Sequence, residues 1–410
     1  MNSRRFLLIA LACTIPLFLV ASGRAPADPN GGLTPIEELG KLLLFDAELS
    51  TPAGLSCAAC HGPQVGFTGP VSGINEGTVV YPGAVHTRFG NRKPPAASYA
   101  GDSPVFHYDA DEGVWVGGVF WDGRATGWTL GDPLAEQAQG PFLNPLEQNN
   151  PNAKHVCLKA QKSAYAGLFR QVWGPDSLDC VKDVEGTYER IARSIAAYER
   201  SSEVNPFTSK YDYFLKGQAD LTPQEAEGLT LFVGKGNCSA CHIAELGPAG
   251  EPPLFTDFTY DNLGVPKNPA NPFYKMPRKW NPTGAAWVDT GLGGFLKSNG
   301  YAPEVFEPEI GKVKVPTLRN VDLRPSAEFV KAYAHNGYFK SLKAIVHFYN
   351  TRDTLPTCSS SAQTPGLDCW PAPEVPATVN HDELGNLGLT EAEEDAIIAF
   401  MKTLSDGYVP

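Results

Sequence analysis

Apolar positions recur with helical spacing along most of this chain, and one pattern appears twice. The segments Leu33-Thr34-Pro35-Ile36-Glu37 and Leu221-Thr222-Pro223-Gln224-Glu225 are both capping boxes with proline at the first helical position, so each predicts a helix start. Each predicted helix then carries a Leu-Phe pair, Leu44-Phe45 in the first and Leu231-Phe232 in the second. The similarity indicates duplication of one structural unit, not a long solenoid.

Helical spacing returns near the end of each half of the chain. Tyr188 to Tyr198 has the pattern of an amphipathic helix. The segment 390–393 is a further capping box and predicts a last helix through Ile397, Phe400 and Leu404. Strand-like alternation is scarce, so we expect a mainly α fold.

Glycine and proline are abundant, and this predicts long ordered loops between the helices. The chain of 410 residues contains 41 Gly and 36 Pro, concentrated in stretches such as 62–95 and 246–296. Its length suits two domains of ordinary size. We expect one domain over residues 28–218 and a second over 219–410, packed together.

Each predicted domain carries one Cys-x-x-Cys-His pentapeptide, Cys57-Ala58-Ala59-Cys60-His61 and Cys238-Ser239-Ala240-Cys241-His242. This spacing attaches a c-type haem, because two thiols reach the two vinyl groups of one porphyrin and the adjacent imidazole lies under the iron. A thioredoxin-like dithiol would not require the histidine, and a zinc site would need a second pair of ligands nearby. Two complete copies predict two covalently bound haem c groups in two cytochrome c-like domains.

The N-terminus has the pattern of a secretory signal peptide. Arg4 and Arg5 precede an apolar run over residues 6–20, and Ala25-Pro26-Ala27 offers a cleavage site. The run is short and contains a threonine and a proline, which argues against a spanning helix; a retained membrane anchor is the alternative. We therefore expect a signal peptide over 1–27, a periplasmic location and no membrane span in the mature form.

Cysteine usage agrees with an oxidising compartment. Of nine cysteines, Cys13 would leave with the signal peptide and four would hold haem, so Cys157, Cys180, Cys358 and Cys369 remain. An even remainder predicts two disulfides. Proximity in sequence favours Cys157–Cys180 and Cys358–Cys369, although four cysteines allow three connectivities.

The chain is acidic, which limits its partners. Its formal net charge is -12, and loss of the arginines of the signal peptide would make the mature protein about -15. This argues against nucleic acid and against anionic membrane surfaces as partners.

Further motifs, in order along nearly all of the mature chain, resemble the bacterial di-haem cytochrome c peroxidase superfamily, which includes MauG. They are Val119-Phe120-Trp121-Asp122-Gly123-Arg124-Ala125, Glu136-Gln137-Ala138-Gln139-Gly140-Pro141, Asn144-Pro145-Leu146-Glu147, Pro316-Thr317-Leu318-Arg319-Asn320, His335-Asn336-Gly337 and Tyr349. The resemblance implies a two-haem enzyme that reacts with hydrogen peroxide.

The resemblance also implies roles for single residues. Trp121 would lie between the haems and carry electrons or holes; a packed core indole is the structural alternative. Gln137 and Glu147 would lie over the peroxide-binding haem of His61, with Pro141 beside them. A carboxylate suits that place because a base must move a proton between the peroxide oxygens as their bond breaks, and a glutamine can orient the oxygen.

The sixth ligand of the second haem separates branches of this superfamily. Peroxidases fed by small cytochromes place Met there, whereas MauG-like members place Tyr. In this chain the position, fourteen residues after His335, is Tyr349. It lies on an apolar stripe of helical spacing with Leu342, Ile345 and Val346, which also fits a core tyrosine. An anionic phenolate favours oxidised iron, which suits the storage of an oxidising equivalent.

The MauG-like branch implies a periplasmic enzyme that uses hydrogen peroxide to form a high-valent di-haem state and then oxidises a residue of a partner protein. Within that branch the sequence is most similar to MbnH, which converts a partner tryptophan to kynurenine, so we expect a tryptophan target. The alternative is a di-haem cytochrome c peroxidase that draws electrons from a small cytochrome or cupredoxin. A plain electron-transfer cytochrome is a third hypothesis, but it leaves Gln137 and Glu147 without a task.

Several positions depart from the family pattern. MauG has a surface Trp two residues before the second haem cysteine, where this chain has Gly236, so Trp280 or Trp287 would have to provide an exit for holes. His86 lies near the place of a blocking histidine, and a sixth ligand, a pocket hydrogen bonder and an ordinary loop histidine all remain open. The resemblance implies one calcium ion near the haem interface, but Asn91-Arg92-Lys93-Pro94-Pro95 and the Arg324-Pro325-Ser326 region match its motifs imperfectly.

Overall fold

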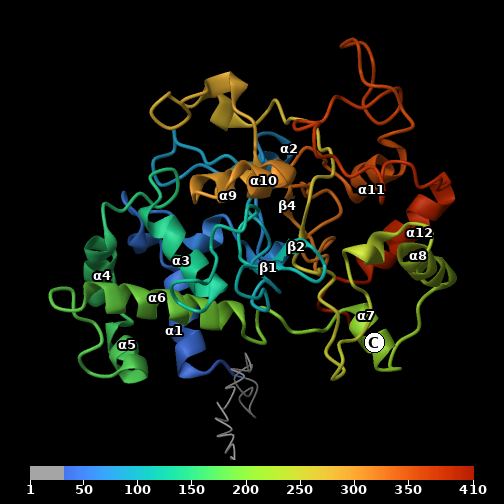
Figure 1. The fold of residues 1–410 in the computed structure, drawn as a ribbon. Coiled ribbons are helices and arrows are strands. Elements are labelled where there is room, and N and C mark those ends of the chain that lie inside the picture. The colour runs from blue at the N-terminus through green and yellow to red at the C-terminus, as the bar shows by residue number, and fades with distance from the viewer. Residues whose placement is uncertain (1–31) are drawn as a thin grey trace, which may run out of the picture.

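The computed structural model describes residues 32–410, and the predicted signal peptide lies outside them. The described chain is mainly α-helical, as expected, with two small sheets (Figure 1). Most helices of the first half lie on the left of Figure 1, and the helices at the beginning and end of the second half lie on the right. Long loops run between these two groups.

The first half contains six helices and one hairpin in the described residues. The helices are α1 (Pro35–Phe45), α2 (Ser72–Glu76), α3 (Pro133–Leu143), α4 (Ala153–Lys162), α5 (Ala166–Trp173) and α6 (Val184–Glu199), with 3-10 turns η1 (Ala47–Leu49), η2 (Cys57–Ala59) and η3 (Pro63–Val65). Strands β1 (His107–Asp109) and β2 (Val114–Val116) pair antiparallel, with Tyr108 opposite Trp115.

The second half contains the remaining six described helices and a short ladder. The helices are α7 (Lys210–Leu215), α8 (Pro223–Val233), α9 (Gly291–Ser298), α10 (Pro303–Phe306), α11 (Leu342–Thr351) and α12 (Glu391–Lys402), with 3-10 turns η4 (Cys238–Ala240), η5 (Pro272–Lys275), η6 (Gly284–Ala286) and η7 (Glu307–Glu309). Strands β3 (Tyr260–Asp261) and β4 (Val313–Lys314) pair antiparallel, with Tyr260 opposite Lys314.

The predicted helix starts are confirmed. The Glu37 carboxylate accepts from the Thr34 amide at 2.7 Å, and that of Glu225 accepts from the Thr222 amide at 2.7 Å, so both capping boxes form. The last helix ends at Lys402, two residues earlier than the sequence pattern predicts, although Leu404 is buried beyond its end.

The two halves of the chain share one feature of helix packing, a glycine at the crossing of two helices. A side chain at Gly40 of α1 would meet the Ser194 carbonyl of α6 at 1.8 Å, and one at Gly228 of α8 would meet the Ala396 carbonyl of α12 at 1.9 Å. Only glycine permits so close an approach of two helix backbones. The same contact therefore stands at the same place in each half.

Two large hydrophobic cores follow the two halves. The first contains buried residues from Leu39 to Val204, and the second contains buried residues from Tyr211 to Leu404. This separation supports our proposal that the boundary between two haem domains lies near residue 218, as the sequence predicts.

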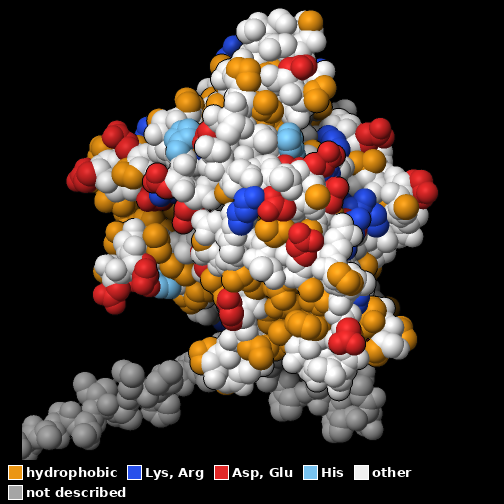
Figure 2. Space-filling model, turned by 90° about the vertical axis from the view of Figure 1, so that its right-hand side faces the viewer, with side chains coloured by type: hydrophobic (Ala, Val, Ile, Leu, Met, Phe, Trp, Pro, Cys, Tyr) orange, Lys and Arg blue, Asp and Glu red, His pale blue; other side chains and the backbone are white. Residues whose placement is uncertain are grey.

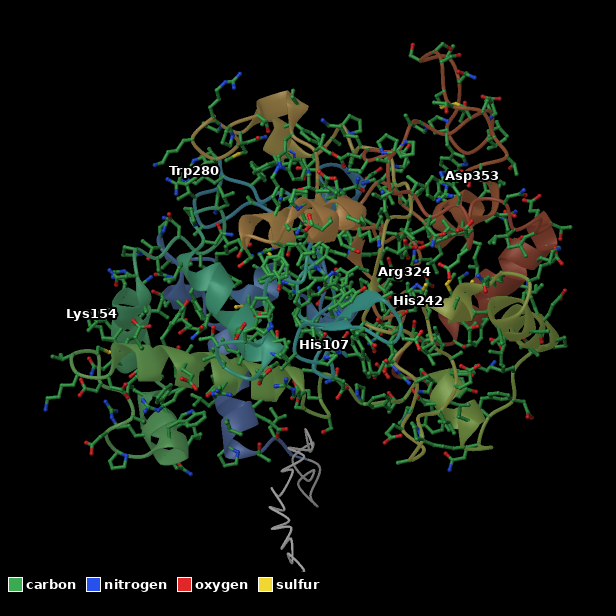
Figure 3. All side chains as sticks on the ribbon, viewed as in Figure 1. His107, Lys154, His242, Trp280, Arg324 and Asp353 are labelled. Carbon is green, nitrogen blue, oxygen red and sulfur yellow. A yellow bond between two sulfur atoms is a disulfide. The ribbon has the colours of Figure 1, made fainter. Side chains whose placement is uncertain are left out.

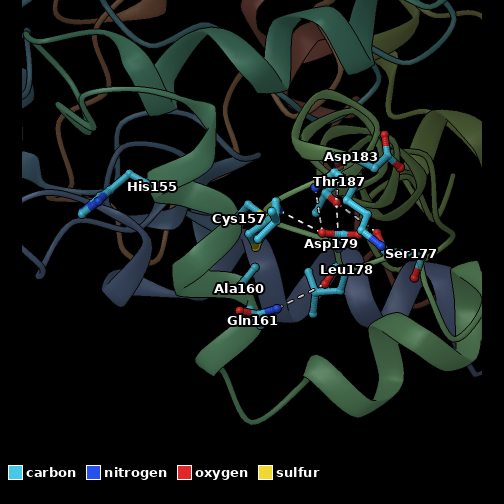
Figure 4. The surroundings of a disulfide bond; sticks show 12 residues. His155, Cys157, Ala160, Gln161, Ser177, Leu178, Asp179, Asp183 and Thr187 are labelled. Carbon is cyan, nitrogen blue, oxygen red and sulfur yellow. Dashed lines mark hydrogen bonds between the residues drawn. A yellow bond between two sulfur atoms is a disulfide. The ribbon is translucent and has the colours of Figure 1, made fainter.

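Both predicted disulfides are confirmed. Cys157 bonds to Cys180 and Cys358 bonds to Cys369. Around the first bridge, shown in Figure 4, the Thr187 hydroxyl donates to the Ser177 carbonyl at 3.1 Å, and the bridge ties α4 to the segment before α6. The second bridge closes a loop that follows α11.

The halves are joined by backbone contacts that cross the centre of the molecule. The Lys93 amide donates to the His335 carbonyl at 2.8 Å, and the Lys314 amide donates to the Trp121 carbonyl at 2.9 Å. These bonds hold segments of one half against segments of the other.

Figure 2 shows the face formed by the right-hand side of Figure 1, with apolar side chains gathered over its lower part and charged ones scattered around them. No helix within residues 32–410 combines the length and the apolar character of a membrane span.

Candidate functional site

The two motif histidines are held in the same way. The Nδ1 of His61 hydrogen-bonds to the Phe67 carbonyl at 3.0 Å, and the Nδ1 of His242 to the Phe255 carbonyl at 2.8 Å. Both phenylalanines have left-handed backbone angles, with φ of 53° and 54°. A carbonyl partner makes Nδ1 the donor, so the Nε2 lone pair remains for a metal, and burial lowers the pKa of both imidazoles and favours the neutral form.

Each motif opens onto its own cavity. Cys57, Cys60 and His61 line the first cavity, and the corresponding Cys238, Cys241 and His242 line the second. The four thiols are half-buried and form no disulfide, and burial raises the pKa of each to about 12, unlike the low-pKa thiolate of a redox dithiol. Thiols, a neutral imidazole and a largely apolar cavity together fit a covalently attached haem in each half.

The wall of the first cavity carries the predicted peroxide-handling residues together. Helix α3 presents Gln137 and Pro141 one turn apart on the same face, and Glu147 follows in the next loop; all three line the cavity. The Ala84 amide donates to the Glu147 carbonyl at 2.7 Å and so fixes that loop. Burial raises the pKa of the Glu147 carboxyl, against the opposing effect of Arg124.

Trp121 lines both cavities. Its loop is closed by an antiparallel bridge between Val119 and Ala125, and its indole N–H donates to the Lys93 carbonyl at 2.8 Å. The side chain is only 7% exposed. The indole therefore has a fixed position in the wall that separates the cavities.

Helix α11 places Tyr349 in the wall of the second cavity, together with Ile345 and Val346 one turn earlier. The end of this helix is pinned, since the Gly385 amide donates to the Tyr349 carbonyl at 2.6 Å and the Arg352 guanidinium donates to the Leu384 carbonyl at 3.1 Å. Burial raises the pKa of the Tyr349 phenol well above its ordinary range, so a phenolate there would require a nearby cation such as a metal.

The structure does not bring His86 to these residues. His86 is exposed and lies outside the lining of both cavities. Of the three open roles, an ordinary loop histidine fits this placement without any movement of the chain. A ligand role stays a prediction.

Trp280 and Trp287 also lie away from the cavity walls. Arg88 and Lys279 contact the Trp280 ring, with Arg88 at 5.0 Å from its centroid, and Trp287 packs edge-on against Phe273 at 5.0 Å. Figure 3 shows Trp280 at the upper left, far across the molecule from His242.

One acidic residue of the first cavity lies in none of the sequence motifs and was not predicted as a site residue. Glu199, at the end of α6, lines this cavity, is 5% exposed, and its Oε2 has no hydrogen-bond partner among the described residues. Burial raises its pKa to about 8. It lies one residue after the predicted amphipathic segment Tyr188 to Tyr198, and only the fold turns it toward the cavity.

Residues of the predicted calcium motif already have other partners in the structure. The Asn91 carbonyl accepts from the Asn271 amide group at 2.8 Å, and the Arg92 guanidinium pairs with Asp122 and Asp289, each at 2.6 Å. In the part of the chain that the structure describes, no group of three or more His, Cys, Asp or Glu side chains could hold a metal ion. Calcium stays a prediction.

Comparison with known proteins identifies the family. Residues 35–220 match the model of the family described as di-haem cytochrome c peroxidase. The methylamine utilization protein MauG of Paracoccus denitrificans is 35% identical over 97% of this chain and 96% of its own length. Relatives of lower identity include cytochrome c peroxidases.

Comparison with solved structures supports the same family. The diheme peroxidase BthA from Burkholderia thailandensis has a TM-score of 0.74 and 32% identity, over 92% of this chain and 86% of that one. A MauG-like protein associated with microbial copper homeostasis has a TM-score of 0.63 over 97% and 96% of the two chains, and its 22% identity shows a shared fold. The family implies two haem c cofactors and peroxide-dependent oxidoreductase activity. This chain belongs to the di-haem cytochrome c peroxidase family that includes MauG.

Proposed function

We propose that this protein is a periplasmic di-haem c enzyme that uses hydrogen peroxide to oxidise a tryptophan of a partner protein. The proposal rests on one observation, that the two cavities are lined by different functional side chains. Gln137, Pro141 and Glu147 line the first, whereas Tyr349 lines the second. One cavity is thus equipped to handle peroxide and the other to close the iron with an oxygen ligand.

In the first cavity, Glu147 would take the proton of the near peroxide oxygen and return it to the far one as the O–O bond breaks, releasing one water. Burial raises the pKa of its carboxyl, which makes the carboxylate a stronger proton acceptor for this exchange. The Gln137 amide would orient the peroxide without competing for the proton, and Pro141 would limit the space beside it. When bound, the two haems would accept the oxidising equivalents of peroxide and hold them for the partner.

Trp121 would couple the two haems, because its fixed indole lines both cavities. Tyr349 would hold the second haem together with His242, since both line its cavity. An anionic oxygen ligand favours oxidised iron, so this haem would be a store of oxidising power and would not bind peroxide.

A partner protein would exchange electrons at the surface, since both cavities lie inside the fold. Trp280 and Trp287 are the exits that the sequence suggests. The structure offers another: Trp128, which is 50% exposed, has its ring 5.8 Å from Phe106, and Phe106 is 5.9 Å from Tyr260. Tyr260 pairs with Lys314, whose amide bonds to the Trp121 carbonyl. We propose Trp128 as the exit.

The periplasmic location rests on the predicted signal peptide, on the haem c motifs and on two disulfides of the kind found in oxidising compartments. A calcium ion at the haem interface remains part of the proposal that the family implies.

The alternative function is peroxide reduction with electrons from a small cytochrome or cupredoxin, in which two electrons and two protons convert hydrogen peroxide into two waters. Relatives named peroxidases favour it. Steady-state peroxide consumption with a reduced small cytochrome distinguishes the two. Our proposal expects slow turnover, with oxidation of a tryptophan when a true partner is present; rapid sustained turnover supports the alternative.

A further inference from the structure

Three residues line both cavities: Lys93, Ala96 and Trp121. Lys93 is the only one of them that carries a charge. Its backbone is fixed on both sides, because its amide donates to the His335 carbonyl at 2.8 Å and its carbonyl accepts from the Trp121 indole at 2.8 Å. Lys93 is therefore built rigidly into the junction between the two cavities.

The Lys93 ammonium has no acidic partner in the described residues. Its Nζ donates to the Thr68 hydroxyl at 3.0 Å and to the Pro94 carbonyl at 3.1 Å, both neutral oxygens. Burial lowers its pKa to about 8, and no neighbouring carboxylate opposes this. An ammonium removed from water without an anion is costly, so a buried lysine of this kind indicates a missing negative charge.

A second buried lysine repeats the observation in the second cavity. Lys331 is 5% exposed, and its Nζ donates to three backbone carbonyls, those of Val65 at 3.0 Å, Asn320 at 2.8 Å and Leu323 at 2.9 Å. It forms no ion pair within residues 32–410 either. Close to the junction, the Nδ1 of His335 is buried, lines the second cavity and has no hydrogen-bond partner among the described residues. The junction thus holds two buried ammonium groups that have no ion-pair partner among the described residues.

We propose that Lys93 binds haem propionates from both cavities and is a counter-ion shared by the two haems. A haem c is held by thioethers through its vinyl groups, and its two propionate carboxylates are its anionic groups. Two haems would bring four carboxylates into a fold whose shared wall holds an unpaired ammonium. Lys331, whose three N–H groups already donate to backbone carbonyls, would contribute positive charge but no hydrogen bond to the second haem.

This assignment makes Lys93 a positioning residue with two tasks. Its carbonyl holds the Trp121 indole, and its ammonium would hold the edges of both haems against that indole. The charge would also act on the irons of bound haems, because a nearby cation disfavours the extra positive charge of oxidised iron and so raises the reduction potential. The inference requires that both haems are bound and does not depend on the substrate that the enzyme oxidises.

The test is a spectroelectrochemical titration of both haems in the holoprotein. Lys93→Met removes the charge and retains the apolar stem, and we expect the reduction equilibrium constants of both haems to fall by about tenfold, ~59 mV for a one-electron couple. Lys93→Arg retains the charge and should restore both potentials. Lys314→Met is the matched control, because the Lys314 ammonium also donates only to neutral oxygens, those of two backbone carbonyls, but lines the second cavity alone. Its loss should therefore leave the first haem unchanged.

If Lys93→Met changes the reduction potential of only one haem, Lys93 is not shared between the two haems. If the reduction potentials of both haems stay unchanged, Lys93 does not bind a propionate. If Lys93→Met does not load haem, Lys93→Gln supplies the same comparison with a neutral side chain that can still hydrogen-bond. Equal shifts in Lys93→Met and Lys93→Arg would also contradict the proposal, since they would show that shape and not charge matters.

Discussion

The indole N–H of Trp121 donates to the backbone carbonyl of Lys93 at 2.8 Å, and these two residues, with Ala96, form the part of the wall that both cavities share. One hydrogen bond thus fixes both an oxidisable ring and a buried cation at the junction. The other half of the molecule closes on the same place, because the Lys314 amide donates to the Trp121 carbonyl at 2.9 Å. The junction is rigid on both sides, as a route for charge between two haems should be.

Replacement of the proposed base should separate peroxide cleavage from haem binding. Glu147→Gln should slow the reaction with peroxide by about 10²–10⁴-fold, because proton transfer between the oxygens is lost, and should leave the spectra of both haems unchanged. In the unsubstituted protein the rate of the peroxide reaction should increase as the pH rises through the pKa of Glu147, because only the ionised carboxylate accepts a proton. Burial raises that pKa above its ordinary value. Stopped-flow mixing with peroxide measures both effects; a Glu147→Gln variant as fast as the parent protein would exclude this carboxylate.

The helix crossing of the second domain should depend on Gly228. Gly228→Ala would place a methyl group 1.9 Å from the Ala396 carbonyl and 2.9 Å from the Phe400 side chain, so α8 must move away from α12, at a cost of about 1–3 kcal/mol or more. Thermal unfolding of the holoprotein should show a lower Tm. Gly167→Ala in α5 is the control, since no atom outside its two chain neighbours and its own helix backbone lies within 4 Å of the new methyl group. It should be neutral or slightly stabilising. Equal Tm values for both variants would contradict the crossing.

Chelation tests the calcium ion that the family implies. If calcium supports the haem interface, exhaustive treatment of the holoprotein with a chelator should change the haem spectra, and added calcium should reverse the change. In this region the carboxylates of Asp122 and Asp289 already pair with the Arg92 guanidinium. A spectrum and a metal content that chelation does not alter would remove calcium from the proposal.

The surface exit should be separable from the peroxide reaction. Trp128→Phe retains the contact with Phe106 but removes an exposed ring that is easily oxidised, so oxidation of the partner should slow while the reaction with peroxide keeps its rate. Trp280→Phe and Trp287→Phe are the comparisons. If either of those variants slows partner oxidation and Trp128→Phe does not, the exit lies on the other face.

The sequence predicted those features that depend on neighbours along the chain. The Cys-x-x-Cys-His segments, the capping boxes at Thr34 and Thr222 and the two disulfides are local patterns, and the boxes and disulfides are as predicted. The resemblance to a family supplied Trp121, Gln137, Glu147 and Tyr349, which the fold brings to the cavity walls.

Other parts of the site could not be predicted from the sequence, because they depend on contacts between distant segments of the chain. Lys331 meets the carbonyl of Val65, 266 residues away, and only the packing of the two halves removes its ammonium from water. Glu199 looks like one more polar residue of an amphipathic helix until its carboxylate is seen in the wall of the first cavity. His86 stands near a suggestive position in the sequence, but its side chain is exposed.

The most direct test of the account is to mix the holoprotein with one equivalent of hydrogen peroxide and count the oxidising equivalents that it retains, in the parent protein and in Tyr349→Phe. The account predicts that the parent protein holds two equivalents long enough to be titrated with a reductant, and that Tyr349→Phe shows an altered spectrum of the low-spin haem and loses this stored state. An unchanged spectrum and an unchanged store in Tyr349→Phe would contradict the assignment of Tyr349 and, with it, the proposed division of labour between the two haems.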